Sequence, residues 1–229
     1  MRFVSTPAQD ELRARVRAFL ADACPPAEVR RLMETDRGYD PAVWREIVAA
    51  GWLDLPFADL AVVVDEAGAA LLGAPLLGTA VARCVLPDGD PEATVALALA
   101  EDSGRWAAEA VTLRATVSAG GGGWRLDGHK SFVVDGWVAD TLLVAGRTDT
   151  AGVALFAVAG DAPGLAQTRL ATLDLTRQQT RIQFSATPAR RIGEGDGSGD
   201  DFDRVLDVAA TLLAAEQVGG AQRCLDMTV

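Results

Sequence analysis

The chain has 229 residues, of which 49% are apolar and 23% are charged, so it can bury a sizeable core and is not an extended disordered chain. Its 32 acidic and 21 basic residues leave a net charge of −11, which disfavours nucleic acid and anionic membrane surfaces as partners. No apolar run approaches the ~20 residues of a membrane-spanning helix. The polar first residues also differ from a secretion signal. We therefore expect a cytoplasmic protein without a membrane or nucleic-acid partner.

Metal and disulfide chemistry is disfavoured by the number and spacing of the residues that it needs. Cys24, Cys84 and Cys224 are far apart and odd in number, and His129 is the single histidine. A structural zinc site needs four cysteine or histidine ligands, usually in closely spaced pairs. We therefore expect reduced thiols and no metal ion.

The N-terminal part of the chain is patterned as helices. Residues 6–9, Thr-Pro-Ala-Gln, form a capping box with proline at the first helical position, and residues 24–26, Cys-Pro-Pro, end the helix that follows. Asp40-Pro41 repeats the start signal, and Gly51 suits the left-handed position after a last turn. Two further apolar helical segments follow, at residues 58–72 and 75–85. We expect an all-helical domain over residues 1–90.

From residue 91 the apolar period changes from helical to strand-like. Short runs without intervening helices predict an antiparallel barrel or sandwich rather than a parallel sheet. A hairpin is expected to turn at Asp135-Gly136. The predicted strands are residues 94–99, 111–117, 124–128, 131–134, 141–145, 153–158, 165–173 and 180–184. We expect this β-domain over residues 91–192.

The last part of the chain is patterned as a linker and one long helix. Residues 194–201 are acidic and glycine-rich, as in a flexible linker. The helix after them carries large aliphatic residues that leave no wide polar face: Val205, Val208, Leu212, Leu213, Val218 and Leu225. We expect a homodimer or larger species that buries residues 205–229 between chains. The alternative is that the N-terminal helices cover this helix.

These patterns together predict an α+β fold. An N-terminal all-helical domain is followed by an antiparallel β-barrel or sandwich domain and a final long helix. Residues 193–229 then form an acidic linker and the start of a truncated C-terminal helical domain.

Several segments, in the same order along the chain, match the motifs of one family. The helical part contains TPAQDELRARVRAFLAD, WREIVAAGWLDLPF and AVVVDEAGAALLGAPLLGTAVA. The strand region contains LALAED, then GWRLDGHKSFVVDGWVADTLLVAGR where the family has GxKxWITNG, and LATLDLTRQQTRIQF. The last match is LLAAEQVGGAQRCLDMT. With these segments the chain resembles the bacterial branch of the acyl-CoA dehydrogenase family of flavoproteins, without that family's C-terminal helical bundle.

This resemblance implies an FAD site formed by the LALAED segment and by the segment aligned with WITNG. The implied contacts to the isoalloxazine ring lie at Leu99, Ala100, Ser103, Phe132, Val133 and Val134. Ala100 and Val134 carry no hydroxyl where the family pattern has threonine, and Phe132 replaces tryptophan. Main-chain N–H groups are still able to bind a flavin at these positions. If the resemblance to the family is set aside, the residue types at 132–134 are typical of an ordinary buried strand.

The resemblance also implies a glutamate that removes the α-proton of an acyl thioester. One family position for it lies in the C-terminal bundle, and the other is an early turn of the last helix, where this chain has Ala209. Glu216 and Asp226 are expected to be solvated or paired with another element, and His129 to be a surface imidazole. Arg177 matches a family segment in which an arginine approaches a nucleotide phosphate, and a solvated loop arginine is the alternative. The catalytic residue is therefore unknown.

We predict an acyl-CoA dehydrogenase-like oxidoreductase of fatty acid or lipid metabolism that uses FAD for the α,β-dehydrogenation of an acyl-CoA thioester. Because no base is identified, the chain is expected to be inactive alone, either as a fragment or as a reduced subunit beside a complete partner. The expected partners are an acyl-CoA thioester and either copies of the same chain or a heteromeric dehydrogenase partner. The alternative function is a flavin-free scaffold that supports a complete dehydrogenase.

Overall fold

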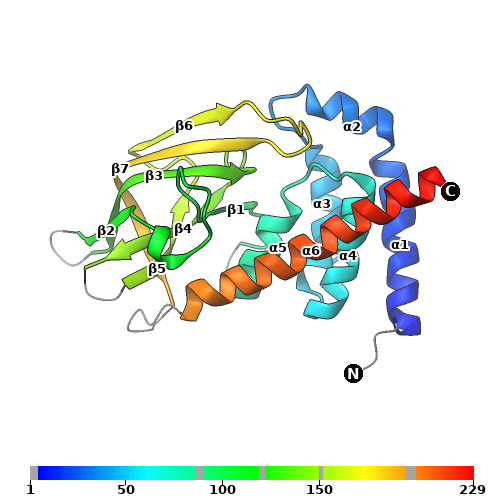
Figure 1. The fold of residues 1–229 in the computed structure, drawn as a ribbon, viewed down its shortest axis with the longest axis horizontal. Coiled ribbons are helices and arrows are strands. Elements are labelled where there is room, and N and C mark those ends of the chain that lie inside the picture. The colour runs from blue at the N-terminus through cyan, green and yellow to red at the C-terminus, as the bar shows by residue number, and fades with distance from the viewer. Residues whose placement is uncertain (1–4, 86–89, 119–121, 150–151, 194–199) are drawn as a thin grey trace.

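The structure of the chain, a computed structural model, describes residues 5–85, 90–118, 122–149, 152–193 and 200–229. Its element order is a group of helices, a group of strands and one long helix (Figure 1). The predicted α+β class is confirmed, whereas most of the predicted linker at residues 194–201 lies outside the described residues. Among the described residues, no helix is both long enough and apolar enough to cross a membrane.

The N-terminal helices are α1 (Pro7–Ala23), α2 (Pro26–Met33), α3 (Pro41–Ala49), α4 (Phe57–Ala70) and α5 (Leu76–Val85). The capping box at α1 forms as predicted: the Gln9 N–H donates to the Thr6 hydroxyl at 3.2 Å, and the Gln9 side chain accepts from the Thr6 N–H at 3.0 Å. Helix α1 ends at Ala23, directly before Cys24-Pro25-Pro26 as predicted, and a helix that the sequence analysis did not predict, α2, follows. Proline also suits the first helical position, and Pro26 begins α2.

The strands are β1 (Val95–Ala98), β2 (Arg114–Val117), β3 (Trp124–Val134), β4 (Thr141–Thr148), β5 (Gly152–Ala159), β6 (Leu165–Leu170) and β7 (Gln179–Ile192). The ladder β4-β2-β3-β7-β5 closes on itself through a β4–β5 pairing, so these strands form a barrel. It is antiparallel as predicted, except that β1 and β2 run parallel to β4. β1 and β2 pair with successive parts of β4, and the barrel wall is therefore interrupted between them.

The predicted strands at 124–128 and 131–134 are one strand, β3. Its register against β7 shifts twice, between Leu126 and Gly128 and between Lys130 and Val133. These irregularities, rather than a turn, interrupt the alternating pattern of the sequence. Asp135-Gly136 do form a turn, but it leads to β4, which pairs with β1, β2 and β5. The expected hairpin is therefore wrong, because the strand before this turn, β3, pairs with β2 and β7 and not with the strand after it, β4.

Strand β4 separates two apolar cores. Leu142 and Val144 point into the barrel, where they join the cluster that contains Phe156. Leu143 and Ala145 point outward and join the cluster formed with the helices. A strand buried on both faces explains the nearly continuous apolar run at this point of the sequence.

The final helix, α6 (Asp200–Thr228), runs across α5 and α4 and ends beyond α1 (Figure 1). Its crossing with α4 needs glycine on both helices. A Cβ at Gly68 would lie 2.0 Å from the Glu216 carbonyl oxygen, and one at Gly219 would lie 1.8 Å from the Asp65 carbonyl oxygen. The two backbones can approach this closely only because neither residue has a side chain.

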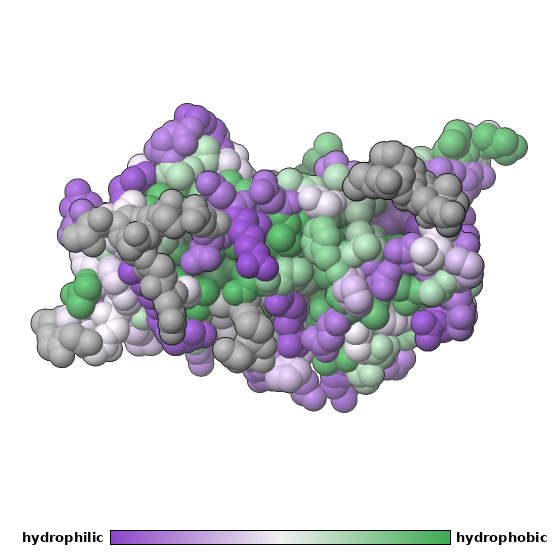
Figure 2. All heavy atoms as spheres, turned by 90° about the horizontal axis from the view of Figure 1, so that it is seen from below, coloured by the Kyte–Doolittle hydropathy of each residue, from purple (hydrophilic) through white to green (hydrophobic). Residues whose placement is uncertain are grey.

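The expectation that another chain buries all of residues 205–229 is corrected for the first half of α6. Val205 and Leu212 are fully buried within this chain, in a cluster with α4 and α5. Val218 and Leu225 are exposed, and so is the whole segment 221–229. This end projects from the molecule and is partly apolar (Figure 2). Within α6, the large apolar side chains left exposed for a further partner lie in this last part.

A buried ion pair occupies the interruption of the barrel wall between β1 and β2. Lys130, on β3, has no exposed surface, and its Nζ lies 3.0 Å from the Leu99 carbonyl oxygen and 3.0 Å from Glu101 Oε1. Glu101 also accepts hydrogen bonds from the N–H groups of Thr112 and Leu113 at 2.8 and 2.9 Å and from the Thr112 hydroxyl. The pair thus satisfies main-chain groups at the end of β1 and ahead of β2.

Burial acts on the two charges in the same sense, toward the neutral form. It lowers the pKa of the Lys130 ammonium to about 8, against the opposing attraction of Glu101. For Glu101, burial by itself would raise the pKa. The hydrogen bonds from Thr112 and Leu113 and the charge of Lys130 outweigh this effect of burial and lower the pKa of Glu101 to about 2. Glu101 therefore stays ionised at neutral pH, and Lys130 keeps its charge only because of this partner.

Breaking the buried pair should destabilise the chain strongly. We expect Lys130→Met or Glu101→Gln to lower the free energy of unfolding by about 3–5 kcal/mol, because each leaves one buried partner uncompensated. In the unsubstituted chain Glu101 holds the folded-state pKa of Lys130 at about 8, and Glu101→Gln removes this attraction and lowers that pKa further. The two folded chains therefore differ in the charge of Lys130 only below about pH 8, and the loss should shrink as the pH rises from neutral through 8. Urea unfolding across this pH range measures the loss.

The exposed pair Arg105–Glu109, 2.7 Å apart, is the matched control. Arg105→Met or Glu109→Gln should change the unfolding free energy by less than about 1 kcal/mol. Equal effects of the buried and exposed substitutions would contradict the role given to the Lys130–Glu101 pair.

Candidate functional site

The structure brings together the two segments that supply the six predicted site residues. Leu99 and Ala100 directly follow β1, and Phe132 lies near the end of β3. The Ser131 N–H donates to the Ala100 carbonyl oxygen at 3.0 Å. The Phe132 ring lies beside Gly104, 3.9 Å from the position that a Cβ would take there. The end of β1 and the end of β3 therefore form one surface.

Burial separates the six residues into a floor and a rim. Leu99, Ala100 and Val133 are buried. Ser103 is exposed, Val134 is half-buried, and 46% of Phe132 is exposed. The expectation of an ordinary buried strand therefore holds for Val133 and fails for Phe132.

Phe132 has an unusual backbone conformation. Its φ is +58°, in the left-handed region that large side chains rarely adopt, and it sits in the register shift between Lys130 and Val133. Such a bulge redirects a side chain that would otherwise follow the strand alternation. Backbone strain of this kind persists only where the surrounding structure imposes it, and it is common at binding sites.

A main-chain donor is available beside this ring. The Asp135 N–H donates to the Gln178 carbonyl oxygen at 3.0 Å, and Val134 pairs with Gln179 in the same antiparallel ladder. Because hydrogen-bonded and non-bonded positions alternate, the N–H of Val134 points away from β7. An exposed aromatic face, an apolar floor and a main-chain donor fit a planar heteroaromatic ring such as isoalloxazine.

Charged groups surround the rim of this surface. Asp102, in the turn after β1, accepts hydrogen bonds from the Ser131 hydroxyl at 2.6 Å and from the Arg181 guanidinium. His129 Nε2 lies 3.1 Å from Asp102 Oδ2, so the imidazole is near a carboxylate and not simply solvated. The hydrogen bonds from Ser131 and then Arg181 lower the pKa of Asp102. Asp102 and Glu101 are thus weak bases, unsuited to proton abstraction.

The other catalytic candidates are also accounted for by the structure. Ala209 is buried and carries no carboxylate. Glu216 forms an ion pair with Arg177 between α6 and the β6–β7 loop, so Glu216 is paired with another element, and Arg177 is not simply a solvated loop arginine. Asp226 is exposed and accepts a hydrogen bond from Gln222 at 2.7 Å. None of these residues is a free base at the six-residue surface.

The sequence interpretation missed Lys130 and Glu101, which hold this surface from below. A signal was present, because Lys130 is the only lysine of the chain and stands at the lysine of the GxKxWITNG pattern. A single lysine among 21 basic residues is also explained by a composition bias toward arginine, so the count did not by itself single out Lys130. Its partner could not be identified, since 29 residues separate Lys130 from Glu101.

Asp135 is a buried carboxylate in the turn after β3. It is 7% exposed, and among the described contacts its side chain has no hydrogen-bond donor. Burial raises its pKa to about 6, against the opposing charge of Arg177. Its φ of +58° suits asparagine as well as aspartate.

Replacing this carboxylate by its neutral isostere should stabilise the chain near neutral pH. Because the folded-state pKa of about 6 lies above the ordinary 3.8, the stability linked to Asp135 is fully present below pH 3.8 and is lost as the pH rises through 6. We expect Asp135→Asn to raise the unfolding free energy by up to about 3 kcal/mol at pH 7.5 and by little at pH 4. Urea unfolding at both pH values measures this difference, and Asp22→Asn on the exposed face of α1 is the control. A gain that is equal at both pH values would contradict it.

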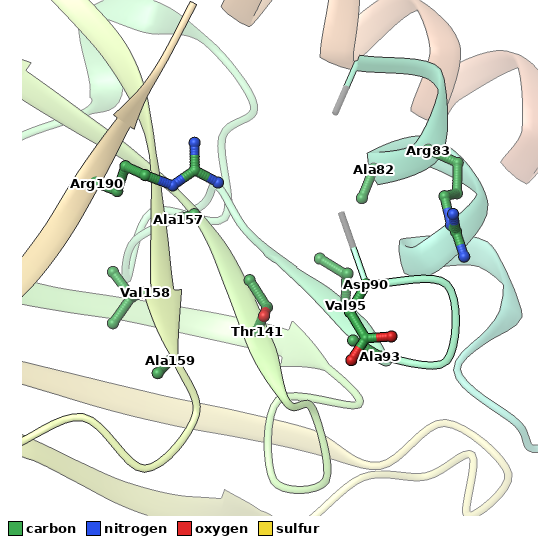
Figure 3. Close-up of a pocket in the computed structure, with 10 residues that line it drawn as sticks. All are labelled: Ala82, Arg83, Asp90, Ala93, Val95, Thr141, Ala157, Val158, Ala159 and Arg190. Carbon is green, nitrogen blue, oxygen red and sulfur yellow. The ribbon is translucent and has the colours of Figure 1, made fainter. Parts of the chain in front are cut away.

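A separate pocket of about 330 Å³ lies at the other end of β1, between α5 and the β4–β5 edge (Figure 3). Arg83 and Arg190 lie on opposite sides of it, and Val95 lines it from the start of β1. None of the six predicted site residues lines this pocket. Arg83 is engaged by the Pro91 carbonyl oxygen and lies 3.8 Å from Asp54. The pocket and the six-residue surface are therefore distinct.

No protein-family model matches the chain, but the chain is similar to individual known proteins. It is 35% identical over 239 aligned residues to the acyl-CoA dehydrogenase IpdE2 of Mycobacterium tuberculosis, an alignment that covers 98% of this chain and 64% of that protein. The chain thus spans less than two thirds of this relative.

Solved structures with the same fold include two assemblies. The ChsE4-ChsE5 complex from Mycobacterium tuberculosis matches with a TM-score of 0.85 and 26% identity, over 100% of this chain and 67% of that chain. A variant of the steroid ACAD Tcur3481-Tcur3483 matches with a TM-score of 0.83 and 28% identity, over 96% of this chain and 65% of that chain. PigA, solved with FAD and proline, has a TM-score of 0.80 at 20% identity over 100% of this chain and 69% of that chain, which shows the fold alone.

The ordered motifs, the helix–barrel–helix architecture and the similarity to IpdE2 agree with one another. The chain belongs to the acyl-CoA dehydrogenase family.

Proposed function

We propose that this chain supplies one wall of an FAD and acyl-CoA site in a cytoplasmic acyl-CoA dehydrogenase-like oxidoreductase. The observation that carries the proposal is the exposed Phe132 ring on the strained bulge of β3, next to the end of β1. When bound, FAD supplies the acceptor for the hydride that leaves the β-carbon of the acyl chain. The other steps depend on groups that bind, orient and shield this reaction.

The residues of the chain have separate parts in this proposal. Phe132 covers one face of the flavin ring, and the N–H of Val134 donates to its edge. Leu99 packs into the core formed with the helices and Val133 into the barrel core, so both anchor this wall from behind. The Lys130–Glu101 pair keeps the two segments at a fixed separation. Ser103 completes the exposed rim, and Ala100 completes the buried part of the surface. Ala100 has no hydroxyl, so it offers no side-chain hydrogen bond to the flavin.

The proposal leaves the base for the α-proton to another part of the assembly. Glu101 and Asp102 are held by hydrogen bonds with lowered pKa, and Glu216 is paired with Arg177. The exposed end of α6, residues 221–229, offers a contact for further helices. These helices belong either to a longer form of this chain or to a partner, as in the complexes named for the two structural neighbours. A homo-oligomer remains an alternative assembly.

Flavin binding is tested with the visible absorption spectrum of the purified chain after addition of FAD. We expect a bound yellow chromophore, and about tenfold weaker binding for Phe132→Ala, because the aromatic face is lost. Phe132→Trp should retain binding, and Val134→Thr should strengthen it by adding a hydroxyl. Phe57→Ala removes an exposed ring at the start of α4 and is the control. If no bound chromophore appears in the unsubstituted chain or in any variant, the proposal that this chain binds flavin is wrong.

Turnover is expected to need more than this chain. Catalysis requires a base and a hydride acceptor on opposite sides of the same substrate carbons. The described residues therefore should not oxidise a saturated acyl-CoA with an artificial electron acceptor at a useful rate, even with FAD bound. Turnover by the purified chain without a partner would contradict this expectation.

A flavin-free scaffold is the second candidate function. Ala100 and Val134, which lack the family's hydroxyls, favour it. In this case the barrel and the exposed end of α6 stabilise a complete dehydrogenase, and the chain stays colourless while it raises the partner's thermal stability. The same absorption measurement therefore separates the two candidates.

A further inference from the structure

We propose that Asp102 is the positioning residue that keeps the Phe132 bulge in its left-handed conformation and so keeps the ring turned outward. This proposal rests on the proposed function only in that the ring is taken to contact a flavin. We call the hydrogen bonds of Asp102 to Ser131 and Arg181 the clamp. The clamp is present in the chain without any ligand, and it is tested in the ligand-free chain.

The bulge at Phe132 has a free-energy cost. Phe132 has φ +58°, and a large side chain in this region is an outlier that the neighbouring contacts must hold in place. On the C-terminal side, the ladder with β7 does this, through the pairing of Val133 with Thr180 and the hydrogen bond from the Asp135 N–H to Gln178. The N-terminal side lies within the register shift and lacks a regular ladder.

Ser131 is the anchor on that N-terminal side. Its N–H donates to the Ala100 carbonyl oxygen at 3.0 Å, and its hydroxyl donates to Asp102 Oδ1 at 2.6 Å. Ser131 is itself buried. The turn after β1 therefore holds the residue immediately before the bulge by one main-chain and one side-chain hydrogen bond.

Asp102 joins three elements through one carboxylate. Besides Ser131 on β3, its Oδ1 accepts from Arg181 on β7, and its Oδ2 lies near His129 earlier on β3. Arg181 Nη1 also lies 3.0 Å from the Ser131 hydroxyl oxygen, so the three groups form a closed network. A hydrogen bond between charged partners is stronger than one between neutral groups.

Core packing does not explain the position of Asp102. Its side chain is 59% exposed, so it could turn into solvent without leaving a cavity. Its contacts are with the residue before the bulge and with that residue's neighbours, rather than with the apolar cores. The side chain thus fixes the rim of the site, while the buried Lys130–Glu101 pair fixes the floor.

Amide hydrogen exchange, measured by NMR on the chain without ligand, tests the clamp. We expect Asp102→Ala to speed exchange of the Ser131 amide by about tenfold or more, since its side-chain anchor is lost. Exchange of the Asp135 amide, which is held by β7, should change less than about twofold. Asp102→Asn keeps an oxygen acceptor for Ser131 and Arg181 and should stay within about threefold of the unsubstituted chain.

A second background shows whether the clamp opposes strain at Phe132. Glycine adopts positive φ freely, so in a Phe132→Gly chain the added Asp102→Ala substitution should speed Ser131 exchange by less than about threefold. The proposal is overturned if Asp102→Ala leaves Ser131 exchange unchanged, if Asp102→Asn behaves like Asp102→Ala, or if the glycine background makes no difference.

Titration with FAD keeps this proposal separate from the proposed function. If the chain binds FAD, Asp102→Ala should weaken binding about tenfold and Asp102→Asn should not. If FAD binding is absent but the exchange results hold, the positioning role stands and the flavin function fails. If FAD binds with unchanged affinity in Asp102→Ala, the significance of the ring position for the flavin is overturned, while the exchange results alone decide whether Asp102 holds the bulge.

Discussion

The buried contact between Lys130 and Glu101 is the interaction on which the rest of the site depends. β1 and β2 lie end to end along β4, and a barrel wall interrupted in this way leaves main-chain groups without strand partners. The carboxylate accepts from Thr112 and Leu113, and the ammonium donates to Leu99. Two charges in an apolar wall are unfavourable separately, and they are stable here because each one's hydrogen bonds are nearly all made by fixed groups. The end of β1 and the bulge of β3 are therefore held at a constant separation.

Other charged residues connect the barrel to the helices or hold the rim of the site. Arg177 and Glu216 join the β6–β7 loop to α6, at the place where α6 crosses α4 on paired glycines. Asp102 gathers Ser131 and Arg181 beside Phe132. Asp135 differs from these residues, because its buried carboxylate has no donor among the described contacts. Arg177 and Arg181 thus connect elements that are distant in the sequence, each through an ion pair with a carboxylate.

This arrangement explains how the site can be well formed while the chain lacks a base. A flavin wall needs rigid strands and a fixed aromatic ring, and both come from the barrel. Proton abstraction needs an accessible carboxylate of ordinary or raised pKa near the substrate. Glu101 and Asp102, after β1, have lowered pKa values, and Asp135, whose pKa is raised, is buried in the turn after β3. Because α6 is covered in its first half and exposed in its last turns, further helices can add that group without changing the barrel.

The sequence by itself determined the α+β class, the capped start of α1 and most of the strands, and it predicted the six site positions that lie after β1 and near the end of β3. Capping boxes and apolar periods are local, and the order of family motifs is visible without coordinates. Only the tertiary structure decided that β1 and β2 run parallel to β4, that residues 124–134 are one bulged strand, and that α4 and α5 cover the first half of α6. It also decided the partners of Lys130, Arg177 and Asp102, which are respectively 29, 39 and 79 residues away. Such pairings depend on strand register and helix crossing, which join distant residues that carry no mutual signal in one sequence.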